Sequence, residues 1–333
     1  MNLIQRLRRQ RSTQALRDLV QETRLHPSDF VQPIFVAEEG TSPEPLAALP
    51  GIERVPLDRL GEYCAQLWHL GLRAAALFPV VPEKEKNANG SYALEPENLV
   101  CRSVRRVKAS VPQMLVVADV ALDPFTTHGH DGVLDPISGD VDNDATVEIL
   151  AEQAVLLANS GADILAPSDM MDGRVAAIRK ALDRSSHHHA VILSYAAKFA
   201  SCLYGPFRDA VGSAHAAGTP SLDKRTYQLN PANRREALWE TALDEEEGAD
   251  MLMVKPAGFY LDVISMLRQR TLLPIAAYQV SGEYAMIQAA GRLGWLDGKR
   301  ARDESLLAIK RAGADIILSY FAEAWIRDHY EGG

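Results

Sequence analysis

The stretch Met251-Leu252-Met253-Val254-Lys255-Pro256 decides how the rest of the chain is interpreted. Its continuous apolar run follows Gly248-Ala249-Asp250 and stops at a proline, which predicts a short buried strand. A lysine ends that strand. Because an ammonium group is costly to bury without a partner, we expect this lysine to have a lowered pKa and a nucleophilic amine.

A second lysine stands in a similar place. The run Val191-Ile192-Leu193-Ser194-Tyr195 also predicts a strand, and Lys198 follows it. If Lys198 and Lys255 open into one pocket, each ammonium group lowers the pKa of the other amine, which suits carbonyl chemistry through Schiff bases. The alternative is that each lysine extends from a strand end towards solvent without a chemical role. Finding two such lysines makes us favour the first interpretation.

Composition narrows the class of protein. The chain has 333 residues, 47% hydrophobic and 24% charged, as is typical of soluble globular proteins. Its net charge of -9 argues against a general nucleic-acid binder. The sequence predicts no membrane span and no secretory signal, since long apolar runs are missing. The three scattered cysteines, Cys64, Cys101 and Cys202, form no spaced set, which predicts a reducing cytoplasmic location.

Eight apolar runs predict the strands of one domain over 30–333. They lie at 30–36, 74–80, 114–120, 163–168, 191–195, 251–254, 274–280 and 316–320. Helical patterns at 57–70, 96–109, 146–160 and 172–182 separate several of them, and the proline-rich segment 41–56 is a predicted loop. The tripeptide Gly-Ala-Asp enters the fourth, sixth and eighth runs, where its glycine ends a helix. This alternation predicts a (β/α)8 TIM barrel.

The polar segment 1–29 precedes this domain and contains Arg6, Arg8, Arg9 and Arg11. We interpret it as an extended arm that packs on another subunit. Binding of nucleic acid or anionic lipid by the basic cluster is the alternative.

In such a barrel the active site lies at the carboxyl ends of the strands. The polar residues expected there are Asp119, Ser168, Lys198, Lys255, Ser281 and Tyr320. The long loops 121–145 and 199–231 leave the same face and are predicted to be lids or binding loops. The second loop carries Arg208 and Lys224, whose positive charges suggest an anionic substrate, and an ordinary solvated loop is the alternative.

The loop after the third strand is dense in residues that bind metals or move protons. Asp119, Asp123, His128, His130 and Asp131 all lie within it or at its start. The pair His128/His130 leaves a metal-dependent barrel hydrolase open as an alternative. The run 187–189, three histidines, precedes a strand, and we interpret it as a surface loop on the opposite face.

Several motifs in order resemble the porphobilinogen synthase family, also called 5-aminolevulinate dehydratase. They are residues 166–174 (APSDMMDGR), 194–201 (SYAAKFAS), 204–209 (YGPFRD), 248–256 (GADMLMVKP) and 278–283 (YQVSGE). The resemblance runs from the arginine-rich arm to Tyr320. It implies a lyase that condenses two 5-aminolevulinate molecules into porphobilinogen with loss of water, in tetrapyrrole (heme) biosynthesis.

The resemblance also implies a role for each site residue. Lys255 would form a Schiff base with one substrate and Lys198 with the other. Ser281 and Tyr320 would bind the first carboxylate, and Arg208 and Lys224 the second, with Gln228 nearby. The implied catalytic carboxylates and hydroxyl are Asp119, Asp123, Asp131 and Ser168. Several family members carry arginine where this chain has Lys224, which keeps the charge but loses the bidentate fork.

The chain departs from part of this family in its metal ligands. Many members hold a catalytic zinc with three cysteines, where this sequence has Ala121, Asp123 and Asp131. Carboxylates suit harder ions than zinc, so we expect no active-site zinc. The resemblance is closest to a magnesium-responsive branch, in which Glu240 would hold a hydrated, allosteric Mg²⁺ at a subunit contact of a homo-octamer. From the sequence alone, an exposed helix carboxylate is the alternative for Glu240. A Schiff-base aldolase acting on another keto acid and an inactive barrel used for binding are the alternatives for the whole chain.

Overall fold

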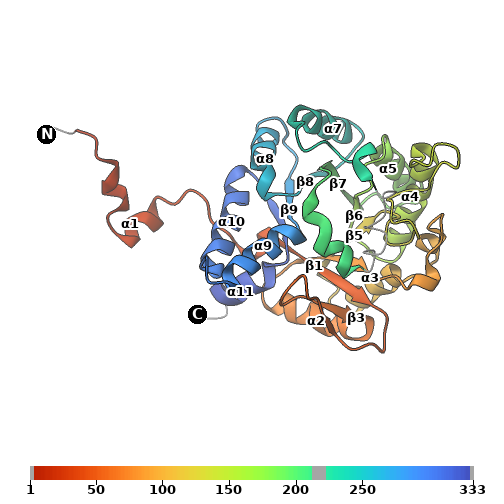
Figure 1. The fold of residues 1–333 in the computed structure, drawn as a ribbon, viewed down its shortest axis with the longest axis horizontal. Coiled ribbons are helices and arrows are strands. Elements are labelled where there is room, and N and C mark those ends of the chain that lie inside the picture. Colours follow the sequence, from red (N-terminus) through yellow and green to blue (C-terminus); the bar gives the residue numbers. More distant parts are fainter. Residues whose placement is uncertain (1–3, 212–222, 331–333) are drawn as a thin grey trace.

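The computed structural model describes residues 4–211 and 223–330, and their strands form a closed parallel barrel (Figure 1). Neighbouring strands pair in chain order, and β10 pairs with β1 through Ile317 and Phe30 to close the ring. The barrel strands are β1 (Phe30–Ala37), β4 (Ala74–Pro79), β5 (Leu115–Val120), β6 (Ile164–Pro167), β7 (Val191–Lys198), β8 (Met251–Lys255), β9 (Ile275–Gln279) and β10 (Ile316–Ser319). All eight predicted strands are present, and the predicted (β/α)8 fold is confirmed.

The strands are apolar throughout because both of their faces are covered. Every residue of β4 and of β9 is buried, with side chains packed inside the barrel or against the outer helices. This is the pattern expected of a parallel sheet enclosed by helices.

Helices surround this barrel (Figure 1). They are α2 (Leu57–His69), α3 (Leu99–Ser110), α4 (Asn143–Asn159), α5 (Arg174–Arg184), α7 (Arg234–Glu246), α8 (Leu261–Arg268), α9 (Ser281–Arg292), α10 (Gly298–Ala312) and α11 (Ala322–Tyr330). The predicted helices at 96–109 and 146–160 are shifted by up to three residues. The reason is capping: the side chains of Asn98 and Asp142 accept N–H bonds from Cys101 and Ala145, which sets where α3 and α4 begin.

The repeated Gly-Ala-Asp tripeptide fastens the amino-terminal end of the barrel. Its glycines, Gly161, Gly248 and Gly313, have φ of +103°, +100° and +119°, which side-chain-bearing residues rarely adopt. Its aspartates each accept a backbone N–H bond of 2.8 Å from the start of a neighbouring strand. The pairs are Asp163 with Val116 of β5, Asp250 with Ile192 of β7, and Asp315 with Ile275 of β9. Each aspartate also pairs with a cation from an outer helix. The motif therefore ties each of three strands to a neighbour at the end opposite the lysines.

Residues 41–56 differ from the predicted loop. They contain two short strands, β2 (Glu44–Pro45) and β3 (Glu53–Pro56), and β3 pairs with the end of β1 outside the closed ring. Pro45 and Pro56 stand at strand ends, where a missing N–H is tolerated. The loop prediction for this segment was wrong because prolines at an edge do not prevent pairing.

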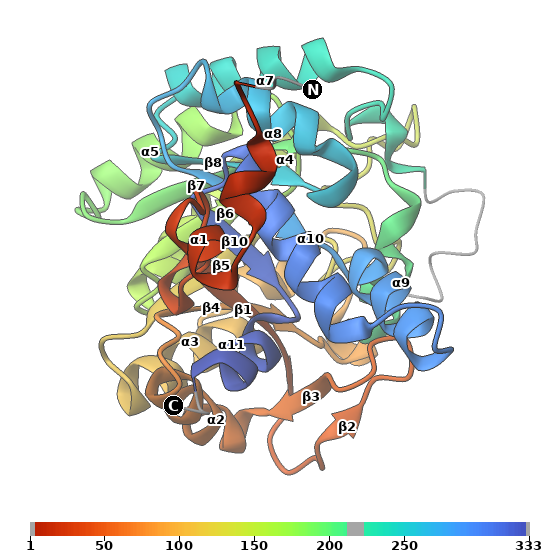
Figure 2. The same cartoon turned by 90° about the vertical axis from the view of Figure 1, so that its left-hand side faces the viewer.

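The N-terminal segment projects away from the barrel in Figure 1, and Figure 2 views the molecule from the side on which this segment lies. It is not wholly extended, since it contains the 3-10 helix Leu7–Arg11 and the helix α1 (Gln14–Leu19). Neither helix has a buried residue, and Ile4, Leu7 and Leu19 are more than two-thirds exposed. In the described residues, no helix combines the length and hydrophobicity that crossing a bilayer requires.

Candidate active site

A β-bulge brings the two lysines to the same level. Lys198 and Lys255 are the last residues of the adjacent strands β7 and β8, and they are register partners. The register between these strands shifts between Ser194 and Ala197, because β7 has one more residue than β8 in this interval. A shift of one residue exchanges the faces of a strand. Without this bulge, Lys198 would not pair with Lys255.

Aromatic rings surround the Lys255 amine. Its Nζ lies 4.6 Å from the ring centre of Tyr278, 5.0 Å from that of Tyr195, and 5.4 Å from those of Tyr204 and Phe207. The side chain is buried. Burial, together with repulsion from the Lys198 ammonium, lowers the pKa of Lys255 from 10.5 to about 7. The neutral, nucleophilic amine predicted for this lysine therefore agrees with its surroundings.

Lys198 has a different environment. Its Nζ donates to Asp131 Oδ1 at 3.1 Å and to the carbonyl oxygen of Ser168. Burial alone would lower the pKa of Lys198, but the charges of Asp131, Asp123 and Asp119 outweigh burial and raise it. The lowered pKa expected for both lysines is therefore found at Lys255 and not at Lys198, where the three carboxylates outweigh burial.

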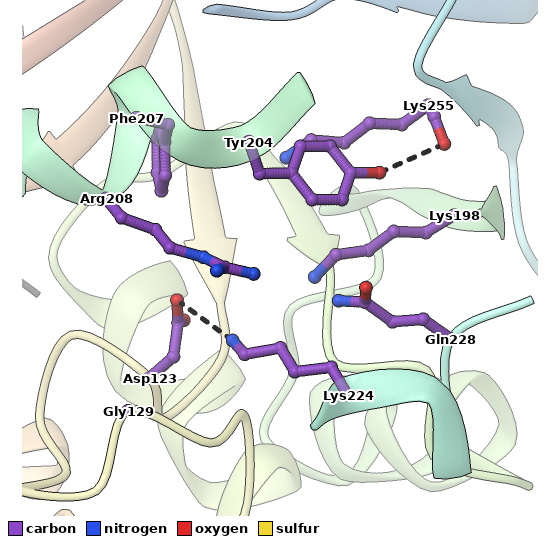
Figure 3. A pocket seen from close by; sticks show the side chains of 9 residues that line it. All are labelled: Asp123, Gly129, Lys198, Tyr204, Phe207, Arg208, Lys224, Gln228 and Lys255. Atoms are coloured by element: carbon purple, nitrogen blue, oxygen red, sulfur yellow. Dashed lines mark hydrogen bonds and ion pairs between the residues drawn. The ribbon is translucent and has the colours of Figure 1, made fainter. Parts of the chain in front are cut away.

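Both lysines line one narrow pocket (Figure 3), whose cavity volume is about 40 Å³. In Figure 3 the amines of Lys198, Lys224 and Lys255 and the guanidinium of Arg208 point towards the same space. The other lining residues are Asp123, Gly129, Tyr204, Phe207 and Gln228. The two long loops predicted to cover the strand ends supply most of this lining, although residues 212–222 of the second loop lie outside the described residues. The pocket thus combines two amines with cations that suit an anionic ligand.

The predicted acidic residues sit together beside Lys198. Asp131 is buried and accepts bonds from Lys198, from Lys224 at 2.7 Å and from the Tyr227 hydroxyl at 3.0 Å. Although burial opposes ionisation, the lysine charges lower the pKa of Asp131. Burial, followed by the nearby Asp123 charge, raises the pKa of Asp119 to about 7. Asp131 is therefore a fixed anion, whereas Asp119 has a pKa suited to proton transfer near neutral pH.

Ser281 and Tyr320, the predicted ligands of one carboxylate, lie behind the pocket lining. The Ser281 hydroxyl accepts an N–H bond from Phe207 at 3.0 Å and donates to the Leu203 carbonyl at 3.3 Å. The hydroxyls of Tyr320 and Tyr278 are 3.0 Å apart. Both predicted ligands therefore contact residues of the ring cage around Lys255 or the chain segment that carries them.

Some buried polar residues near the site were missed by sequence reasoning. Arg174 is 2% exposed and binds both carboxylate oxygens of Asp244 at 3.1 Å and the Ser194 hydroxyl at 3.2 Å. Asp169 lies 3.7 Å from the same guanidinium. Arg174 and Asp169 both fall inside the motif 166–174, so the motif marked the segment without revealing a buried ion cluster.

Glu240 lies on α7, partly buried in a cleft separate from the lysine pocket. The cleft is rich in oxygen donors, including Asp140, Asp172 and Glu236. Within the described residues, no cluster of three or more His, Cys, Asp or Glu side chains is arranged to hold a metal. A single carboxylate among oxygen donors still fits Mg²⁺, which keeps most of its waters.

The histidines of both motifs contact neighbouring polar groups of the protein. The ring of His128 contacts the Ala88 carbonyl at 3.0 Å, and that of His130 contacts the Tyr227 hydroxyl at 3.0 Å. The run 187–189 lies in a surface loop before β7, as predicted, with His187 contacting Asn159. Nothing in these contacts favours a metal-dependent hydrolase.

A closed barrel that presents two buried amines, carboxylates and cations at its strand ends defines a barrel enzyme of carbonyl chemistry. Comparison with known proteins narrows this class. The family model described as "Delta-aminolevulinic acid dehydratase" matches residues 4–327, and the chain belongs to this family. This result overturns the hydrolase alternative.

Individual relatives agree with the family model. The chain is 52% identical to the delta-aminolevulinic acid dehydratase of Chlamydia pneumoniae, over 97% of this chain and 95% of that protein. It is 50% identical to that of Bradyrhizobium diazoefficiens, over 97% and 90% of the two chains. Among solved structures, the Toxoplasma gondii enzyme in complex with its reaction product porphobilinogen has a TM-score of 0.96 at 43% identity, covering 99% of this chain and 93% of that one.

Proposed function

We propose that this chain is a porphobilinogen synthase, which condenses two 5-aminolevulinate molecules into porphobilinogen with loss of water during tetrapyrrole biosynthesis. The observation that carries the proposal is the pairing of Lys198 and Lys255 in one pocket with opposite pKa shifts. Membership of the family supports the same reaction.

Lys255 starts the chemistry in this proposal. With a pKa of about 7, a large fraction of its amine is neutral near neutral pH and attacks the ketone of one substrate. Loss of water then leaves a protonated imine, a cation held among four aromatic rings. The negative faces of those rings stabilise such a cation while they exclude water. The iminium withdraws electrons, so the adjacent carbon of the substrate loses a proton more easily.

Lys198 forms the second Schiff base after it gives up its proton. Asp119, with a pKa of about 7, is the group best suited to take part in this transfer, and Ser168 lies beside it. Asp123 and Asp131 keep the surrounding charge negative while the ammonium is present. Two amines with different resting protonation allow one carbonyl to be captured before the other.

The substrate carboxylates need separate partners. We propose that Ser281 and Tyr320 bind the carboxylate of the substrate held by Lys255, next to the ring cage. Arg208 and Lys224, with Gln228 beside them, bind the carboxylate of the other substrate. Their position in the pocket lining supports this assignment.

The proposed metal dependence follows from the donor atoms. Asp131 is bound to two lysines and Asp123 lies 3.8 Å from Lys224, so these carboxylates balance ammonium charges and suit zinc poorly. We assign the chain to the magnesium-responsive branch, with Glu240 as the carboxylate for a hydrated, allosteric Mg²⁺. Gln228 lines both the lysine pocket and the Glu240 cleft, which offers a route for that effect. When bound, the ion would supply electrostatic stabilisation of the cleft.

The arm supports an assembly of several copies. Its apolar side chains Ile4, Leu7 and Leu19 are exposed, and none of the described residues buries them. We propose a homo-octamer in which the arm contacts a neighbouring subunit. A cytoplasmic location and the lack of nucleic-acid or membrane partners remain predictions from composition.

Two assays test the function. The purified protein is incubated with 5-aminolevulinate, with and without Mg²⁺, and the pyrrole product is measured. Separately, borohydride is added with substrate, and we expect a covalent adduct at Lys255. The variants Lys255→Ala and Lys198→Ala should abolish pyrrole formation, whereas Lys180→Ala, on the exposed side of α5, should leave it unchanged. A wild-type mass spectrum without an adduct would contradict the Schiff-base mechanism.

A further inference from the structure

Glu283 is a buried acid that has no role in the chemistry proposed above. It is the third residue of α9 and is 4% exposed. One carboxylate oxygen accepts N–H bonds from Val280 at 2.7 Å and Ala257 at 3.3 Å, and the other accepts one from Gly258 at 2.6 Å. The bond to Val280 closes the first turn of its own helix. The other two reach the loop that follows β8, so this side chain joins the ends of two neighbouring strands.

The loop that Glu283 binds is the continuation of the Lys255 strand. Ala257 and Gly258 follow Lys255 by two and three residues. A Cβ atom at Gly258 would lie 2.6 Å from Glu283 Oε1, so the carboxylate approaches this backbone more closely than any side-chain-bearing residue would permit. This contact therefore fastens the loop that directly follows Lys255 to the start of α9.

The other side of the connection leads to Ser281. Ser281 lies between Val280 and Glu283, in the turn that the Glu283 carboxylate closes. Its hydroxyl binds the segment 203–207, and a Cβ atom at Gly282 would lie only 2.6 Å from the Leu203 carbonyl oxygen. The turn 280–283 is thus packed against the segment that supplies Tyr204 and Phe207 to the pocket, and Glu283 fixes it to the Lys255 loop.

The chemistry of the group fits this connecting role. Burial raises the pKa of Glu283 to about 7, against the effect of the three N–H bonds, which favour the ionised form. An exposed residue would be sufficient to cap a helix, and burying a carboxyl group is unfavourable unless its bonds are needed. The two carboxylate oxygens together accept three N–H bonds. Glutamine cannot replace them, since its amide has one acceptor oxygen.

We propose that Glu283 is a positioning residue that fixes the spacing between the Lys255 amine and the Ser281 hydroxyl, so that the ketone and the carboxylate of one substrate are bound at the same time. This inference rests on the proposed Schiff-base function of Lys255. It predicts a specific defect. Without Glu283, a keto acid should no longer react with Lys255 more readily than a plain ketone does, because only the keto acid contacts both the Lys255 amine and the Ser281 hydroxyl.

The test uses two probes that form an imine but do not condense, 4-oxopentanoate and butanone, trapped with borohydride. Adducts at Lys255 and Lys198 are quantified by peptide mass spectrometry. In the wild type we expect preferential trapping of 4-oxopentanoate at Lys255. In Glu283→Gln and in Gly258→Ala, which displaces the carboxylate from the opposite side, that preference should fall at least tenfold. Trapping of butanone should change less than twofold.

Controls separate the possible outcomes. Asp297→Asn removes the acid that caps α10 by accepting the N–H bond of Arg300, and it should keep the full preference. Glu283→Asp keeps both oxygens and should recover part of it. If the wild type forms no adduct at Lys255, the proposed function fails, whatever Glu283 does. If the wild type forms it and both Glu283→Gln and Gly258→Ala keep the keto-acid preference, the positioning role is overturned. Should Glu283→Gln not fold, Gly258→Ala decides by the same criterion.

Discussion

Replacing Lys255 by methionine should inactivate the protein and make it more stable. The pKa of Lys255 falls from 10.5 to about 7 on folding, mainly because the amine is buried and also because Lys198 repels it. The Lys255 amine therefore carries a proton in the unfolded protein that it holds only weakly in the folded protein. Methionine has a similar length and no charge, so it fills the ring cage without this penalty.

The pKa change sets the size of the effect. At 1.36 kcal/mol per pKa unit, a fall from 10.5 to about 7 corresponds to roughly 5 kcal/mol of lost stability. Attraction between the ammonium and the surrounding rings offsets up to about 2 kcal/mol of this. We therefore expect Lys255→Met to gain about 3–5 kcal/mol at pH 7 or below. The gain should shrink between pH 7 and 10.5, because the unfolded state loses its extra proton across this range.

Urea unfolding of both proteins at a series of pH values between 6.5 and 10 measures this gain. Protein concentration must be equal throughout, since assembly also contributes to apparent stability. A Lys198→Met variant provides the contrast, because its ammonium has a carboxylate partner and its removal should destabilise the protein. A Lys255→Met variant that is less stable than the wild type, or whose gain does not depend on pH, would refute the reasoning.

Three further outcomes are expected. Asp131→Asn removes a buried ion-pair partner, so it should lower stability by about 3–5 kcal/mol in urea unfolding and shift borohydride trapping of Lys198 to lower pH. Arg174→Ala leaves its two buried acidic partners unpaired, and urea unfolding should show a loss of similar size, about 3–5 kcal/mol. Glu240→Gln should abolish the stimulation of pyrrole formation by Mg²⁺ after chelator treatment, whereas Glu236→Gln in the same cleft should retain it.

The fold was predictable because its signals are local and repeated. Each barrel strand is a short apolar run, and the Gly-Ala-Asp tripeptide marks three helix-to-strand junctions by backbone conformation and a carboxylate bond. Because Lys198, Lys255 and Asp119 stand at or near the carboxyl ends of their strands, the sequence predicted that all three lie at one end of the barrel. The short strands in 41–56 were missed because their prolines indicate a loop, although β3 pairs with β1 and β2 pairs with β3 at the edge of the sheet.

The parts of the site that depend on contacts between distant segments were not predictable. The β7 bulge leaves no mark in the run 191–198, yet it is what aligns Lys198 with Lys255. The ring cage gathers side chains from β7, β9 and the segment after β7, none of which stand out singly in the sequence. The protonation of Lys198 likewise depends on Asp131, 67 residues away in the chain.

The unequal environments of the two lysines give Asp131 a place in the reaction order. Asp131 binds Lys198 and Lys224 together, so the charge of Lys224 helps to keep this carboxylate ionised. Because Asp131 stays ionised, it holds the proton on Lys198 while the neutral Lys255 amine captures the first ketone. That proton must leave before Lys198 captures the second ketone, and Asp119, with a pKa of about 7, is the acceptor proposed above. Asp131→Asn weakens the hold on the proton, so trapping of Lys198 at lower pH in this variant tests whether Asp131 delays the second capture.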